Sequence, residues 1–258
     1  MATLLRILFT GRRLWATLLV IAGAIALARL GLWQLDRLAQ RRALNAMIDA
    51  RMVQPPAPLD GGAIDPDALE YRQVTVRGVY DSGQEIVLRN RSLDGAPGVH
   101  VLTPLRLSGG DAVLVDRGWI PMSEAGAEQR RAYAPPAGEI VVEGIARRSQ
   151  ESAFGPQDSA PRPGESRLDA WFQVNIPRIA GQASYPLLPI YVEQQPAPGD
   201  PPLPRRVAAA DLGEGPHLSY AVQWFAFALI LLVGYVAFTR QQLRHLNDRA
   251  GGAIRELR

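Results

Sequence analysis

Two amino acids are missing from this chain of 258 residues: it contains no cysteine, and its 28 basic residues are all arginine. The lack of cysteine excludes a disulfide framework, thiolate zinc or copper sites, the cysteine pair of a copper chaperone and covalent c-type haem. The lack of lysine excludes a Walker A lysine, a Schiff base and a serine–lysine dyad. Histidine is scarce as well, and its three residues cannot build a histidine-rich metal cage.

Acidic charge is scarce at the two ends of the chain. Residues 1–13 carry three Arg and no acid, and residues 239–258 carry five Arg against two acids. Residues 36–216 hold 19 Arg against 23 Asp and Glu, a net charge of −4. A nucleic-acid-binding protein places its basic excess on a folded domain. Here the excess flanks apolar segments, which predicts a membrane protein that contacts lipid and no nucleic acid.

The clearest apolar segment lies near the C-terminus. Leu218–Phe238 is a run of 21 residues without a charge, enough for a helix to cross the ~30 Å hydrocarbon core of a bilayer. We therefore predict a transmembrane helix over 217–238. The alternative is a buried helix of a soluble protein, but such a helix normally has a polar face, and this segment has little of one beyond Tyr220 and Gln223.

A second apolar segment lies near the N-terminus. Leu14–Ala28 has no charge, Arg29 interrupts it, and the apolar pattern then continues to Leu35. An arginine near a helix end can extend its charge to the membrane interface, so we predict an uncleaved transmembrane helix over 14–35. The alternative is a cleaved signal peptide, which the basic start and the Ala26–Ala28 triplet would suit.

The orientation follows from the second span. Five Arg within 20 residues of its end place the 239–258 tail in the cytoplasm by the positive-inside rule. The 36–216 segment is then periplasmic, and the 1–13 segment is cytoplasmic. The prediction is a multi-pass protein of the inner cell membrane with both termini in the cytoplasm. Around the first span the rule is ambiguous, because Arg37, Arg41 and Arg42 lie just beyond it.

Short strands punctuated by Gly and Pro dominate the segment between the spans. Strands are predicted over 71–80, 85–89, 99–107, 112–115, 140–146, 171–174 and 188–193, with helices over 36–52 and 176–183. Loops rich in Gly, Pro and Ser are predicted over 151–164 and 194–206. This pattern predicts a mainly antiparallel β domain, barrel- or sandwich-like, with short helices.

Few residues suggest chemistry, and no hydrolase or phosphate-binding motif is present. His100 lies within a predicted strand and is interpreted as a structural or surface histidine, and His245 as a solvated one. His217 differs, since it directly precedes the apolar span and shares a helix face with Tyr220 and Trp224. A neutral imidazole is a standard axial ligand of haem iron. The alternative is a histidine that only caps or anchors the helix.

The Asp116–Pro121 segment (DRGWIP) closes a predicted strand. By itself it indicates a strand end with an ion pair between Arg117 and Asp116 and a packed Trp119. A role in chemistry is the less favoured interpretation of this segment.

Four motifs together resemble the surfeit locus protein 1 family. They are Gly31–Arg37 (GLWQLDR), Gly98–Leu105 (GVHVLTPL), Val115–Pro121 (VDRGWIP) and His217–Phe225 (HLSYAVQWF). Each is weak alone, but their order and spacing cover nearly the whole chain. The sequence departs from the family in having Asp116 where Asn is common.

The resemblance implies an assembly factor for haem–copper oxidases, chiefly cytochrome c oxidase, and no enzyme activity. The implied partners are the catalytic subunit of the oxidase and the enzymes that make haem a. Bacterial members are thought to bind haem a and to help deliver it, and the family's haem-linked histidine matches His217. Six motif residues are given structural roles: Gly31, Gln34, Arg117, Gly118, Trp119 and Pro121.

A haem between the two helices is the resulting expectation, with His217 on the iron. The other predicted cofactor-binding residues are Trp33, Tyr220 and Trp224 against the haem body, and Arg29 or Arg37 at its propionates. Close helix approach is expected at the small residues Ala22, Ala26 and Ala221. The alternative for Arg29 is that its side chain only carries its charge to the membrane–water interface. The alternative for Trp33 is that it anchors the helix at that interface. The alternative function is a scaffold for oxidase subunits that binds no haem.

Overall fold

The computed structural model describes residues 11–159, 161, 167–208 and 212–256. Within the two long helices it describes the side chains from Leu14 to His245. Residues 1–10, the end of the predicted 151–164 loop and the last two residues of the tail lie outside the described residues. The chain divides into a helical unit, Met1–Ala46 with Leu212–Arg258, and a β unit, Met47–Asp211.

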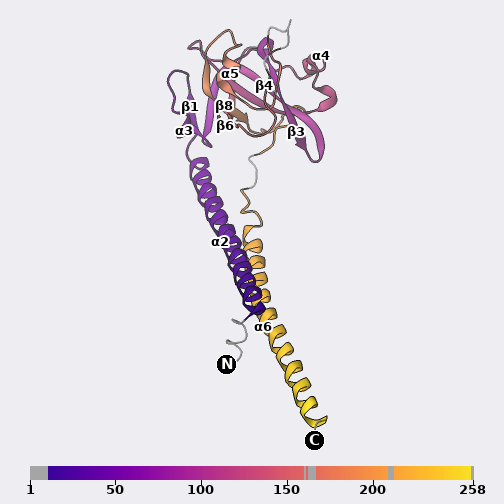
Figure 1. Ribbon diagram of the computed structural model, residues 1–258. Coiled ribbons are helices and arrows are strands. Elements are labelled where there is room, and N and C mark those ends of the chain that lie inside the picture. The colour runs from indigo at the N-terminus through magenta and orange to yellow at the C-terminus, as the bar shows by residue number, and fades with distance from the viewer. Residues whose placement is uncertain (1–10, 160, 162–166, 209–211, 257–258) are drawn as a thin grey trace. The chain divides into compact units, whose positions relative to one another are not determined.

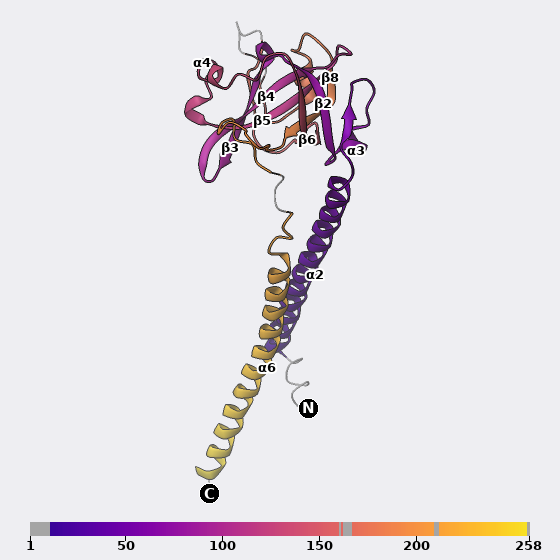
Figure 2. The same cartoon turned by 180° about the vertical axis from the view of Figure 1, so that it is seen from behind.

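The helical unit consists of two long helices that run side by side in opposite directions (Figure 1). Helix α2 spans Arg12–Met52 and helix α6 spans His217–Glu256. The view from behind shows the same pairing (Figure 2). Both helices were predicted, as was the continuation of the first one over 36–52. Helix α6 also continues through most of the basic tail.

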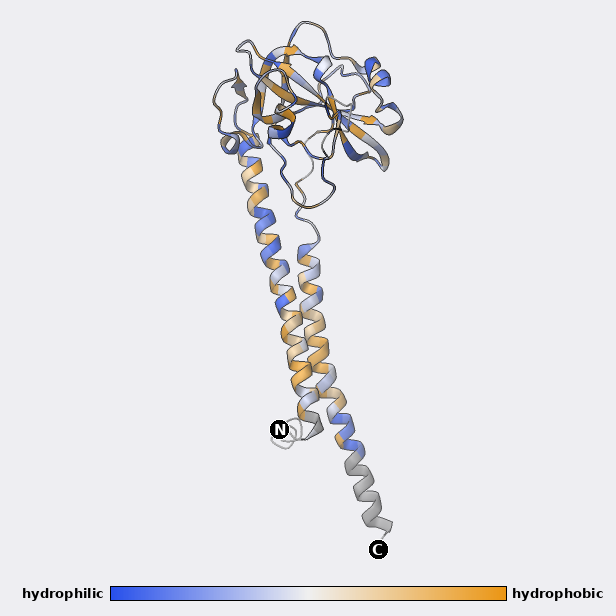
Figure 3. Ribbon diagram, turned by 45° about the horizontal axis from the view of Figure 1, so that its top comes forward, coloured by the Kyte–Doolittle hydropathy of each residue, from blue (hydrophilic) through white to orange (hydrophobic). Residues whose placement is uncertain are grey.

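The paired parts of these helices are apolar on their outer surface. Leu14–Met52 and His217–His245 are each long and apolar enough to cross a membrane, and only 22% and 6% of their most apolar windows are buried. Figure 3 shows the hydrophobic residues gathered along the paired stretch. A core helix of a soluble protein would be mostly buried, so this exposure argues against that alternative. The exact span limits at 14–35 and 217–238 stay predictions.

The β unit is built from eight strands within its described residues. They are β1 Ala57–Leu59, β2 Gln73–Tyr80, β3 Ile86–Leu93, β4 Ala96–Arg106, β5 Ala112–Pro121, β6 Glu139–Arg148, β7 Ala170–Trp171 and β8 Leu187–Gln194. Short helices are α3 Pro66–Leu69, α4 Ala127–Arg130 and α5 Ile176–Ala180. The strand order is β1-β2-β6-β8-β5-β4-β3-β7, and β2 also pairs with β4.

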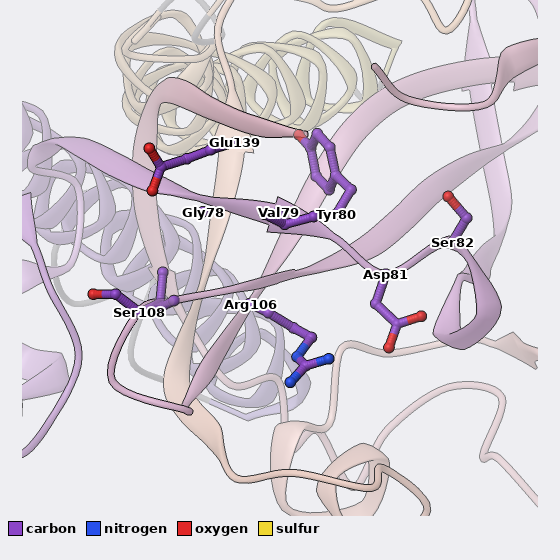
Figure 4. A pocket seen from close by; sticks show the side chains of 9 residues that line it. Gly78, Val79, Tyr80, Asp81, Ser82, Arg106, Ser108 and Glu139 are labelled. Carbon is purple, nitrogen blue, oxygen red and sulfur yellow. The ribbon is translucent and has the colours of Figure 1, made fainter. Parts of the chain in front are cut away.

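The additional β2–β4 pairing closes the sheet into a barrel of β2, β6, β8, β5 and β4. It joins Val79 to Arg106 and Tyr80 to Leu105. A Cβ atom on Gly78 would lie 2.3 Å from the Arg106 carbonyl oxygen, so glycine is needed where the two strands meet. Figure 4 shows the side chains of Tyr80 and Arg106 on opposite sides of this junction. Of the two predicted architectures, the barrel is confirmed.

Most neighbouring strands are antiparallel, as predicted, but three pairs are parallel: β1–β2, β3–β7 and β5–β8. Strand β1 was not predicted, because two of its three residues belong to the proline-rich sequence PPAP at 55–58. It pairs on one side only, where proline is tolerated. The strand predicted over 171–174 is shortened to Ala170–Trp171. Helix α5 confirms the first five residues of the 176–183 prediction.

The barrel interior is a cluster of buried aliphatic side chains. Its central members are Val74, Val76, Leu105, Val113, Val115, Val142, Ile190 and Val192, all at most 1% exposed. A second cluster packs Leu114 and Trp171 against α5 on the outside of the barrel. Val113 and Val115 face inward while Leu114 faces outward, as strand alternation requires. This alternation decides where the side chains of the DRGWIP segment point.

Candidate functional site

Buried residues of α2 recur every seven positions along its contact with α6 and with the segment that precedes α6. Thr17, Ala24, Gly31, Leu38 and Asn45 form this series. A seven-residue repeat keeps one stripe of a helix against its partner, as in a coiled coil. The stripe is the seam of the helix pair, and on the α6 side it contains Ala221 and Ala228.

Glycine allows the two helices to approach closely in this seam. A Cβ atom on Gly31 would lie 2.7 Å from the Phe225 ring, and one on Gly23 would lie 3.2 Å from Leu231. Of the three small residues predicted at the contact, Ala221 is buried, which confirms its assignment. Ala22 and Ala26 are exposed, and their assignment was wrong. Both lie on the outward face of α2.

His217 is the first residue of α6, and it lies half-buried against α2. Its Nδ1 atom is 2.8 Å from the Oε1 atom of Gln34. An amide oxygen only accepts hydrogen bonds, so Nδ1 carries the proton and donates it to Gln34. In the neutral imidazole the Nε2 atom then keeps its lone pair. This is the arrangement of a metal-binding histidine, whose second ring nitrogen donates to a neighbouring acceptor.

The segment before His217 is tied to α2 by polar contacts. Arg42 donates two hydrogen bonds to the Glu214 carboxylate, at 2.7 and 2.9 Å. Arg41 donates to the carbonyl of Gly213 at 3.3 Å, and the Asn45 amide donates to the carbonyl of Leu212. The hydrogen bonds between Arg42 and Glu214 raise the pKa of the Arg42 guanidinium and lower the pKa of the Glu214 carboxyl. The start of α6, and with it the imidazole, is therefore fixed against α2 over several turns.

A glycine lies beside the Nε2 atom of His217. Gly215 has φ +71°, and a Cβ atom there would lie 3.5 Å from the ring Cδ2 and 3.6 Å from Nε2. Glycine therefore places no side-chain atom against this edge of the imidazole. An Nε2 atom that retains its lone pair, with Nδ1 held by an acceptor, fits the axial ligand of a haem iron.

The other predicted cofactor residues lie on α2 and α6, within about two turns of Gln34 or His217 along the helices. Trp33 and Tyr220 are 53% and 46% exposed, while Trp224 is half-buried and meets the Phe227 ring edge-on at 6.1 Å. Arg29 and Arg37 are exposed, and Arg37 donates to Gln40 at 2.8 Å. The Gly31–Phe225 contact fills the seam. The expected haem position between the helices stays a prediction.

The DRGWIP segment lies in β5 of the β unit. The Asp116 carboxylate contacts His100 Nδ1 at 2.7 Å and accepts from the backbone N–H of Gly118 at 3.0 Å. Arg117 contacts Glu85 at 3.2 Å instead. The predicted ion pair between Arg117 and Asp116 was therefore wrong, because consecutive strand residues point to opposite faces. The contact with Asp116 is consistent with the interpretation of His100 as a structural or surface histidine.

Gly118 and Trp119 pack and hydrogen-bond against the backbone at Arg205. Gly118 has φ +121°, and a Cβ atom there would lie 2.6 Å from the Arg205 carbonyl oxygen. The Trp119 and Arg205 backbones exchange hydrogen bonds of 2.9 and 2.7 Å. Trp119 is 7% exposed, which confirms the prediction that it is packed, and Pro121 ends β5.

Sequence reasoning missed two contacts of the motif residues. Gln34 was given a structural role, and its position 183 residues from His217 hid their hydrogen bond. Glu85 and Arg130 were not singled out, although both lie with Arg117 in one buried ion-pair cluster. The sequence feature that could have indicated a role for Gln34 was its position in the GLWQLDR motif, directly after Trp33.

Comparison with known proteins matches the SURF1 family model to residues 21–229. A SURF1-like protein of Monosiga brevicollis is 29% identical over 227 residues, covering 82% of this chain and 83% of that protein. An uncharacterized SURF1-like protein of Mycobacterium tuberculosis is 28% identical, covering 95% and 91%. Surfeit locus protein 1 of Mus musculus is 27% identical, covering 82% and 70%. The matched range contains all four motifs, and the chain belongs to the SURF1 family.

Proposed function

We propose that this protein is a membrane-anchored assembly factor for cytochrome c oxidase, which binds haem a through His217 and aids its insertion into the catalytic subunit. Family membership supports the assembly role. The observation that carries the haem assignment is the Gln34–His217 hydrogen bond, which leaves Nε2 of the imidazole as a ligand atom. The two apolar helices support a location in a membrane. We assign it to the inner membrane with both termini in the cytoplasm, because an arginine-rich tail follows the second span.

Each part of the helical unit has a task in this proposal. Gln34 holds the imidazole in one tautomer, and the contacts of Arg42 and Asn45 hold the segment before His217. In this proposal the exposed rings of Trp33 and Tyr220 offer an apolar surface to the haem body. Arg29 or Arg37 offers a cation to the haem propionates. A bound haem supplies an iron centre that accepts the Nε2 lone pair. The partners are the catalytic subunit and the enzymes that make haem a.

The test compares His217→Ala with His100→Ala in the full-length protein, purified in detergent from a host that makes haem a. We expect the wild type and His100→Ala to show a Soret band, and His217→Ala to lose most of it. His217 is half-buried at a helix start, so its removal leaves the fold intact. Equal expression and an unchanged circular dichroism spectrum check this.

The outcomes separate the haem role from a scaffold role. Full haem content with an unchanged spectrum in His217→Ala would contradict the ligand assignment. A haem-free wild type that still restores oxidase activity in a deletion strain would instead support a scaffold for oxidase subunits. Alkaline phosphatase joined after Arg258 should be inactive if the C-terminus is cytoplasmic.

A further inference from the structure

A cavity of about 450 Å³ lies in the β unit at the end of the barrel where β2, β5 and β8 finish. Its polar lining includes Tyr80, Arg117, Gln194 and Arg206. We propose that this cavity binds a small organic carboxylate, held by the guanidinium groups of Arg117 and Arg206 and by the Tyr80 hydroxyl. The proposal concerns a site separate from His217 and does not rest on haem binding.

Strand alternation places Arg117 at the mouth of the barrel. Val113 and Val115 belong to the interior cluster, and Arg117 is the next residue on the same face of β5. Tyr80 packs against the same interior cluster from the end of β2. The guanidinium carbon of Arg117 is 5.6 Å from the centre of the Tyr80 ring. On the side of the barrel core, the cavity is therefore lined by Tyr80 and Ile140, which pack against the core, and by the buried cation of Arg117.

The ion-pair cluster behind this floor has more positive than negative charge. The Glu85 carboxylate forms ion pairs with both Arg117, at 3.2 Å, and Arg130, at 3.0 Å. Both arginine side chains are at least nine-tenths buried. The Thr103 hydroxyl also donates to Glu85. Among the described residues, Glu85 is the one ion-pair partner of either arginine. A buried cation without a full counter-charge is costly, and an anion in the cavity would supply that charge.

A second arginine faces the same cavity. Arg206 lines it beside Arg117, and the side chain of Arg206 is 17% exposed. Its Nη1 atom pairs with Asp200, but its buried Nε atom has no hydrogen-bond partner within the described part of the chain. Burial lowers the pKa of Arg117, and the nearby Arg206 charge lowers it further, against the opposite effect of Glu85. Arg117 and Arg206 therefore line the same cavity, and their two positive charges repel each other there.

The remaining walls decide the kind of anion. Pro136, Ile140, Val141 and Pro196 line the cavity and suit a carbon body. Two acids also line it: Asp200 is already paired with Arg206, and Glu143 is an exposed residue. A planar guanidinium matches a carboxylate with two parallel hydrogen bonds. The volume lies in the range of small-molecule sites, which occur in barrel mouths. Together these features favour an organic carboxylate over inorganic phosphate.

The experiment titrates the full-length protein in neutral detergent with benzoate, which has one carboxylate and an apolar ring. Binding is followed by isothermal calorimetry and by the shift in thermal unfolding. We expect saturable binding of benzoate, and at least tenfold weaker binding of benzamide, which has the same ring without the charge. Inorganic phosphate should also bind at least tenfold more weakly, because it leaves the apolar walls uncovered.

The decisive variant is Arg206→Gln, with Arg205→Gln as its matched control. Arg205 is the neighbouring residue, but its exposed side chain pairs with Asp94 and does not line the cavity. We expect Arg206→Gln to weaken benzoate binding at least tenfold and Arg205→Gln to leave it unchanged, with equal circular dichroism spectra. Arg117→Gln serves as a second variant if it folds. Absence of saturable benzoate binding at millimolar concentration, or equal affinity in both Arg206→Gln and the wild type, would overturn the proposal.

Discussion

The Oε1 atom of Gln34 accepts a hydrogen bond from Nδ1 of His217 at 2.8 Å, across the seam between two helices. The bond joins the GLWQLDR motif of α2 to the HLSYAVQWF motif of α6. One short contact thus explains why both motifs contain a polar residue within an apolar surrounding. It also gives the imidazole a defined tautomer, which determines which ring nitrogen can bind iron.

The first prediction is that Gln34→Leu weakens haem binding. Without the amide oxygen, the Nδ1 proton has no acceptor in α2, and the ring loses both its orientation and part of its basicity. Loss of such a partner typically weakens metal binding by about 10- to 100-fold. Haem content of the purified protein and the iron–histidine stretching band measure the effect. Gln241→Leu is the control, because Gln241 is an exposed glutamine of α6 that lies 24 residues beyond His217. An unchanged band in Gln34→Leu would contradict the tautomer argument.

The second prediction is that Gly31→Leu separates the two helices. Even a Cβ atom at this position would lie 2.7 Å from the Phe225 ring, so a larger side chain must displace that ring, and we expect α6 to move with it. Gly234→Leu is the matched control, since nothing lies within 4 Å of the Cβ position of that glycine. Because the chain has no cysteine, spin labels can be attached to single cysteines at the exposed positions Leu19 and Val233.

Electron–electron distance measurements on these labels read out the helix separation. We expect a longer and broader distance distribution in Gly31→Leu, and the wild-type distribution in Gly234→Leu. Identical distributions in all three proteins would show that the seam tolerates a large residue at Gly31. Haem content should fall in parallel, because Gln34 lies one turn from Gly31 on the same helix.

The sequence predicted what depends on local periodicity. The charge-free run from Leu218 indicated α6, and the alternation around Val74 indicated a strand. It could not predict contacts between distant segments, such as the closure of the barrel at Gly78 or the bond between Gln34 and His217. These depend on which strands and helices become neighbours, which no single segment encodes.

Local errors have local physical causes. Arg117 was paired with the adjacent Asp116 because opposite charges attract, but the pleat of β5 sends them to opposite faces. Ala22 and Ala26 were chosen for size alone, whereas the seven-residue spacing of Ala24 and Gly31 decides which face of α2 is buried.

The third prediction concerns the stability of the β unit. Gly118 combines φ +121° with a predicted 2.6 Å approach of an added Cβ atom to the Arg205 carbonyl oxygen. Gly118→Ala should therefore lower the free energy of unfolding by more than the strain of its backbone conformation, which alone costs about 1–3 kcal/mol. Gly110→Ala is the control, because Gly110 has φ +92° but nothing within 4 Å of its Cβ position.

Urea unfolding of the full-length protein, followed by near-ultraviolet circular dichroism, compares the two alanine variants. The difference between them isolates the close contact with Arg205 from the backbone strain that both share. Equal losses of stability would show that the backbone around Arg205 moves aside.

The last prediction is that Tyr80 makes the protein less stable at alkaline pH. Burial raises the pKa of its hydroxyl to about 12, although the charges of Arg117 and Arg206 act in the opposite direction. In the unfolded chain a tyrosine ionises near pH ~10. Between these two values the unfolded state releases a proton that the native state keeps, so the free energy of unfolding falls as the pH rises.

The variant Tyr80→Phe lacks this ionisation, while the other tyrosines are the same in both proteins. Relative to Tyr80→Phe, the wild type should therefore lose about 1 kcal/mol of stability between pH ~9 and ~11. Urea unfolding at both pH values measures the loss, and absorbance at about 295 nm should show one fewer group titrating near pH ~12 in the variant. The stabilities of the two proteins would run parallel across this range if the Tyr80 hydroxyl were instead open to water, with an ordinary pKa. The position of Tyr80 against the barrel core, with its hydroxyl 3.3 Å from the Gln194 amide oxygen, predicts that they diverge.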